Sequence, residues 1–181
     1  MDLSGALPLL SSQSQYCDAG MEQIIRTTLT AFAQTVLHGT WYGKEREAVS
    51  YYAFGFLTKA RREGTPLFDP GQIAIEGRIP ATAGHTKKQV CKDLLIWPQS
   101  GMNCWEGRQA IHLPLAIMEW KVNSREFFNY DIQRLQEYTS EYKGLLGIAV
   151  TFDVKRKREL LAAKVLNGTV EEDWLSISIE T

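Results

Sequence analysis

Two strongly apolar segments on either side of an amphipathic stretch constrain the fold of this chain more than any other feature. Residues 113–122 (LPLAIMEWKV) and 145–152 (LLGIAVTF) are short, rich in aliphatic side chains and typical of buried strands. Between them, residues 123–142 place Phe128, Leu135 and Tyr138 at helical spacing. A strand-helix-strand unit of this kind pairs its strands in parallel through a right-handed crossover. We therefore predict an α/β protein.

The segments before and after this unit add further elements. Steps of three and four between apolar residues predict helices, and alternation predicts strands. The expected core is a central mixed sheet of four to five strands flanked by helices, in the order αβββαβ. We expect an N-terminal arm at residues 1–20 and a single domain at 21–181. The other predicted elements are helices at 21–38 and 44–63, strands at 72–80 and 90–97, a loop at 99–110, a short helix within 155–168 and an edge strand at 174–179.

Composition excludes several classes of protein. A formal net charge of -1 is unlike that of a protein that coats nucleic acid non-specifically, although an enzyme needs only a local positive surface. Three cysteines without a CxxC pair indicate neither a disulfide framework nor a zinc site. No basic leader precedes the first apolar residues, and no apolar run approaches the roughly 18 residues that span a bilayer. We expect a reduced, cytoplasmic setting.

Charged residues inside the apolar strands point to chemistry. Asp93 directly precedes LLIW, and Glu119 and Lys121 share one face of the strand at 113–122 because side chains alternate. A buried charge is costly unless it is paired or bound to metal. Mg²⁺, with Mn²⁺ as a substitute, accepts one or two carboxylates, and a neighbouring lysine can orient water or neutralise charge on a phosphate. These residues fit phosphodiester hydrolysis.

Asp93 followed by Glu119-Trp120-Lys121, on adjacent strands with a helix after them, resembles the PD-(D/E)xK nuclease superfamily. The resemblance runs from the helix near residue 44 to the strand ending near residue 152, and it implies a restriction-endonuclease-like core. It implies that Asp93, Glu119 and the backbone carbonyl of Trp120 hold the metal and that Lys121 positions the attacking water. It also implies an assisting carboxylate on the preceding helix, for which Glu45 is the candidate because it shares a stripe with apolar residues.

One residue departs from the family pattern, because Lys92 stands where the family has proline. Glu76 is a further acidic candidate, with pairing to Arg78 as the alternative. Gln133 is a candidate on the helix after the motif, with a surface position as the alternative. The basic run at 155–158 could clamp a phosphate backbone, but a solvated turn or helix start is the favoured interpretation. Candidate nucleic-acid contacts near the site are Lys87, Lys88 and Trp105.

The sequence therefore predicts a Mg²⁺-dependent endonuclease acting on DNA, and it does not exclude RNA. Two alternatives stay open: Glu119 and Lys121 could form an ordinary solvated cross-strand pair, and the chain could be a catalytically inactive nuclease-fold subunit for binding or assembly. Sequence specificity would have to come from loops, a partner protein or a dimer, and one site per chain makes a homodimer the expected way to cut both strands of a duplex. The biological role is not indicated.

Overall fold

A six-stranded mixed sheet organises the molecule, in the order β1-β2-β5-β6-β7-β8. This computed structural model describes residues 11–39, 41, 43–83, 86–107, 109–124 and 128–179, with side chains from residue 19 onward. Within them, β5 and β6 are parallel and the other neighbours are antiparallel, which confirms the pairing predicted from the strand-helix-strand unit. The strands are β1 (Ile73–Pro80), β2 (Gln89–Ile96), β5 (Ala116–Val122), β6 (Leu146–Asp153), β7 (Glu159–Leu166) and β8 (Thr169–Ser178).

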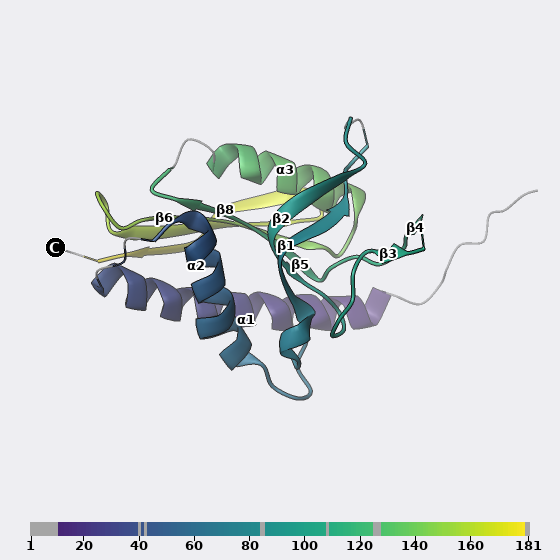
Figure 1. The fold of residues 1–181 in the computed structure, drawn as a ribbon, viewed down its shortest axis with the longest axis horizontal. Coiled ribbons are helices and arrows are strands. Elements are labelled where there is room, and N and C mark those ends of the chain that lie inside the picture. The colour runs from purple at the N-terminus through teal and green to yellow at the C-terminus, as the bar shows by residue number, and fades with distance from the viewer. Residues whose placement is uncertain are drawn as a thin grey trace, which may run out of the picture.

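Helices cover both faces of the sheet. In Figure 1, α1 (Ser11–His38) and α2 (Glu45–Tyr52) lie on one side, and α3 (Phe128–Glu141) lies on the other. Two cores result, one between the sheet and α1 and α2 and the other between the sheet and α3. The described part of the chain contains no helix long and apolar enough to cross a membrane.

Alternation along β5 assigns its side chains to these two cores. Met118 and Trp120 are buried on the α1–α2 side, where Phe32 meets the Trp120 ring edge-on at 5.4 Å between centroids. Ile117 is buried on the α3 side. Glu119 has the same parity as Ile117, so a strand whose two faces are both covered directs a carboxylate toward α3. This face assignment follows the sequence prediction.

The first two predicted helices have other bounds in the structure, and one predicted loop contains strands. The first helix begins at Ser11 rather than at residue 21. The second helix ends at Ala60 rather than at residue 63, because α2 continues only through a π-helical turn (Ala53–Leu57) and a 3-10 turn (Thr58–Ala60). The predicted loop at 99–110 contains a small hairpin, β3 (Trp105–Glu106) and β4 (Gln109–Ala110).

The predicted helix within 155–168 is also wrong, and the sheet has six strands rather than four to five. A turn at 154–157 leads into β7, which pairs with both β6 and β8. Apolar residues lie on both faces of β7, so alternation is hidden in the sequence. Asn167 and Gly168, with φ of 53° and 81°, form the tight turn to β8, and Asn-Gly is a strong hairpin indicator.

Candidate active site

The candidate site lies where β2 and β5 separate. The two strands pair only from Ile96↔Ala116 to Leu94↔Met118, and the next pair would join Asp93 to Glu119. Instead, the Trp120 backbone N–H donates to Asp93 Oδ2 at 2.7 Å. A carboxylate thus replaces a ladder carbonyl as the acceptor of a backbone donor. We call this place the fork.

Lys121 joins elements from both faces of the sheet at the fork. Its Nζ donates to the Trp120 carbonyl oxygen at 2.7 Å. The same Nζ lies 3.5 Å from Glu45 Oε1 on α2 and 3.3 Å from Asp131 Oδ2 on α3. The ammonium is therefore held in place by two carboxylates and one carbonyl.

The electrostatics of this group keep the lysine charged. Burial by itself would lower the pKa of Lys121, but the carboxylates of Asp131, Glu45 and Asp93 raise it above its usual value. Burial raises the pKa of Asp131 and of Glu45, against the lowering effect of Lys121. The positive charge of Lys121 offsets the mutual repulsion of the carboxylates that surround it. The lysine is therefore the central charge of the fork.

Glu119 has a different partner from the one that the sequence suggested. Lys92 Nζ donates to Glu119 Oε1 at 2.5 Å, and the two residues are only 4% and 9% exposed. The same ammonium lies 4.6 Å from the centroid of the Tyr138 ring on α3. Sequence reasoning noted Lys92 only as a departure from the family pattern. Its one indication of a role was a charge placed directly before Asp93 in an apolar strand.

We expect Glu119 to give the folded state a measurable pH dependence. Burial raises its pKa from about 4.5 to about 7, against the lowering effect of Lys92, while Asp93 raises it further. Because the pKa of Glu119 is higher in the folded than in the unfolded state, protonated Glu119 stabilises the fold below about pH 4.5. This stabilisation is lost as the pH rises to about 7. The free energy of unfolding should thus fall by up to about 3 kcal/mol over this range.

Urea denaturation across this pH range, on wild type and Glu119→Gln, measures the effect. The glutamine variant should have a flatter profile, because glutamine does not titrate. Glu172→Gln, at an exposed position on β8, should retain the wild-type slope. Parallel profiles for wild type and Glu119→Gln would contradict the expectation.

Two hollows border the fork. The first, which we call the α3 hollow, has a volume of about 560 Å³ and contains more cationic than acidic side chains. Its charged and aromatic lining residues are Arg78, Lys87, Lys92, Glu119, Tyr130, Asp131 and Arg134. The second is small, about 70 Å³, and Glu45, Glu76 and Asp93 line it on the α2 side together with Arg46. Asp93 and Glu119 therefore open onto different sides of the fork.

The structure brings three of the four predicted catalytic residues together, since Asp93, Lys121 and Glu45 meet at the fork. Glu119 lies within electrostatic range of Asp93 but is bound to Lys92. Asp131, which sequence reasoning missed, contacts Lys121 directly. Its only sequence indication was an acid near the start of the helix after the motif.

The remaining residues that the sequence singled out lie at different distances from the fork: some line its hollows, and others are exposed elsewhere or packed in the core. Glu76 borders the small hollow and pairs with Arg46 at 2.9 Å rather than with Arg78. Gln133 is exposed, two residues beyond Asp131 on α3. Lys87 lines the α3 hollow and Lys88 is exposed nearby in the chain. Trp105 is half-buried and packs against the core under α3, so only part of its side chain is available for contact with nucleic acid.

The donor set at the fork fits a magnesium ion only in part. Among the described residues, no group of three or more His, Cys, Asp or Glu side chains is arranged to hold a metal. Mg²⁺ needs only one or two protein carboxylates, with water and substrate completing its shell. Asp93 and Glu45 border the small hollow and fit that requirement. Glu119 and the Trp120 carbonyl oxygen each accept a hydrogen bond from a lysine ammonium, from Lys92 and Lys121 respectively.

Comparison with known proteins adds no relative: no family model, curated protein or solved structure matches the chain.

Proposed function

We propose that this protein is a Mg²⁺-dependent nuclease that hydrolyses DNA phosphodiester bonds at the fork, with a restriction-endonuclease-like core. The αβββαβ order formed by α2, the strands β1, β2 and β5 of the six-stranded sheet, α3 and β6 supports the proposal. The observation that carries it is the position of Lys121. Its ammonium is held between Glu45 and Asp131 beside Asp93, at the point where two strands separate and next to a hollow lined by cations.

The chain's own residues each have a role in this reaction. Asp93, anchored on the Trp120 amide, would hold the metal together with Glu45, while Glu119 is paired with Lys92 on the α3 side. When bound, the metal supplies a Lewis acid and lowers the pKa of water. Lys121 orients the attacking water and offsets the charge that develops on the phosphate. Arg78 and Lys87 in the α3 hollow attract the flanking phosphate backbone.

The test is cleavage of supercoiled plasmid DNA in Mg²⁺ or Mn²⁺, with EDTA as the blank. We expect Asp93→Asn to lower the cleavage rate by about 100-fold or more, because the variant loses the metal-binding charge. Asp173→Asn, at an exposed position on β8, is the matched control and should cut like wild type. Cleavage that Asp93→Asn leaves unchanged, or that EDTA does not stop, would contradict the proposal.

The second candidate function is nucleic-acid binding or assembly without catalysis. One specific observation favours it: Lys92 and Lys121 already satisfy Glu119 and the Trp120 carbonyl oxygen, two of the groups that the family resemblance assigns to the metal. This candidate requires that wild type binds DNA or RNA, cuts neither and shows no Mn²⁺ binding by electron paramagnetic resonance. RNA cleavage without DNA cleavage would keep the mechanism and change the substrate.

A further inference from the structure

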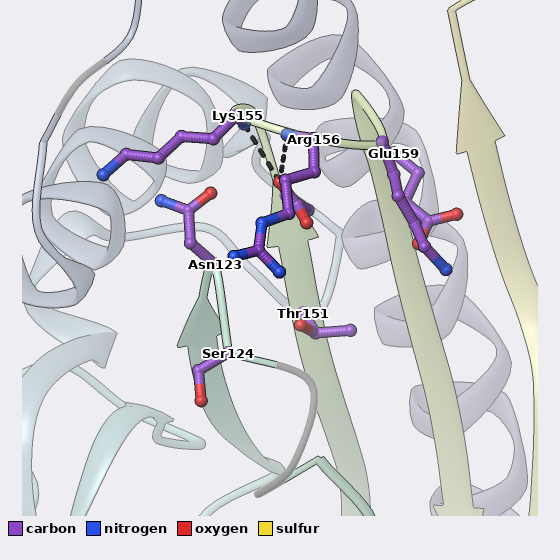
Figure 2. Close-up of a pocket in the computed structure, with 8 residues that line it drawn as sticks. Asn123, Ser124, Thr151, Lys155, Arg156 and Glu159 are labelled. Atoms are coloured by element: carbon purple, nitrogen blue, oxygen red, sulfur yellow. Dashed lines mark hydrogen bonds and ion pairs between the residues drawn. The ribbon is translucent and has the colours of Figure 1, made fainter.

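A second large hollow lies beyond the fork, at the carboxyl ends of β5 and β6. Its volume is about 550 Å³, close to that of the α3 hollow. We call it the turn hollow, since the turn at 154–157 forms one wall. Its polar and cationic lining residues are Asn123, Ser124, Thr151, Lys155, Arg156 and Lys157. Figure 2 shows the Arg156 side chain reaching from the turn toward Asn123 and Thr151.

Strand register places Lys121 between the two hollows. Glu119, two residues before Lys121 on β5, lines the α3 hollow, and Asn123, two residues after it, lines the turn hollow. Thr151, the direct partner of Lys121 on the parallel strand β6, also lines the turn hollow. Glu119 and Lys121 share a face of β5 because side chains alternate, and Asn123 follows the end of the strand with a φ of 55°. The central lysine of the fork therefore has a cation-lined hollow on each side.

The acidic residues of the turn hollow are already engaged. Asp153 Oδ1 accepts hydrogen bonds from the backbone amides of Lys155 and Arg156, at 2.9 and 2.8 Å. Glu159 lies 3.6 Å from Lys157 Nζ. Asp153 thus shapes the turn, and the turn places Lys155, Arg156 and Lys157 at the rim of the hollow, with Lys157 also paired with Glu159.

We propose that the turn hollow binds the phosphodiester backbone of the strand lying over Lys121, on the opposite side of the cut from the α3 hollow. This inference rests on the proposed function and extends it. Residues 119 and 123 are about 13 Å apart along an extended strand. At about 3.4 Å per nucleotide of a duplex strand, that distance is roughly four nucleotides. A mononucleotide does not span it, so the substrate has phosphates on both sides of the cut bond, as in internal cleavage.

Binding of labelled oligonucleotides in EDTA tests the inference apart from catalysis. DNA and RNA of one sequence, both long enough to span the two hollows, are titrated with wild type and with K155Q/R156Q/K157Q. The matched control is K59Q/R61Q/R62Q, which removes the same charge at exposed positions that line neither hollow. The turn variant should bind about 10-fold or more weakly. Its slope of log affinity against log salt should be lower by about two to three, and the control should match wild type.

Ser124→Glu, which places a negative charge in the turn hollow without altering the turn, is an independent variant and should also weaken binding. Equal binding by wild type and the turn variant, an equal loss in both triple variants, or no nucleic-acid binding by wild type would overturn the inference. Loss confined to the turn variant, with no cleavage by wild type, supports the inference and refutes the nuclease. Cleavage by wild type, with normal nucleic-acid binding by the turn variant, supports the nuclease and refutes the inference about the turn hollow. The tighter of the DNA and RNA titrations identifies the substrate.

Discussion

Replacing Lys121 with methionine is expected to lower the rate of metal-dependent DNA cleavage by about 100- to 1,000-fold. Methionine keeps the unbranched stem but loses the ammonium that lies 3.5 Å from Glu45 and 3.3 Å from Asp131. Without it, no cation at that point orients water or offsets charge on the phosphate. Single-turnover cleavage of plasmid DNA in Mn²⁺, at saturating protein, measures the effect on the chemical step rather than on binding.

The controls for Lys121→Met separate catalysis from folding. Lys59→Met removes a lysine charge at an exposed position and should cut like wild type. Circular dichroism and the melting temperature establish that Lys121→Met is folded. A folded Lys121→Met protein that cuts within a factor of a few of wild type would remove Lys121 from the mechanism.

Replacing Lys92 with methionine is expected to destabilise the fold by about 3–5 kcal/mol. The loss leaves the Glu119 carboxylate, only 9% exposed, without its 2.5 Å partner. An uncompensated buried charge is far more costly than the pair itself. The penalty should be smaller in mild acid, where Glu119 takes up a proton because burial raises its pKa. Urea denaturation of wild type and Lys92→Met, at neutral pH and in mild acid, measures these differences in the free energy of unfolding.

A double variant distinguishes the lost pair from lost packing. Lys92→Met/Glu119→Leu removes both charges and should recover most of the stability, since an apolar pair of similar size is tolerated at such sites. Arg46→Met breaks the exposed pair with Glu76 and should cost no more than about 1 kcal/mol. If the double variant is as unstable as Lys92→Met, then packing of the lysine stem, and not the orphaned carboxylate, explains the loss.

Several features of the fold could be predicted because they depend on neighbours in the sequence. The parallel pairing of β5 and β6 follows from two apolar strands joined by an amphipathic helix. The division of β5 between two cores follows from alternation, which also places Glu119 and Lys121 on one face. The inward position of Glu45 follows from the helical stripe it shares with Val49 and Tyr52.

The failures concern contacts between distant segments. The predicted edge strand at 174–179 is confirmed as the second half of β8, but β7 was missed because a strand buried on both faces loses the alternation that identifies it. The partner of Glu119 was missed because it depends on where β2 and β5 stop pairing, which no local pattern encodes. Asp131 was missed because its contact with Lys121 joins α3 to β5, and no local pattern encodes where the helix lies over the sheet.

The sequence by itself thus determined the α/β class, the strand-helix-strand unit and the concentration of charge in two apolar strands, since each is set by local periodicity. Only the tertiary structure decided which charges meet: Lys121 with Glu45 and Asp131, and Lys92 with Glu119. The physical reason is that the free energy of a buried charge depends on the atoms within a few ångströms of it. In this fold those atoms come from helices and strands far apart in the chain.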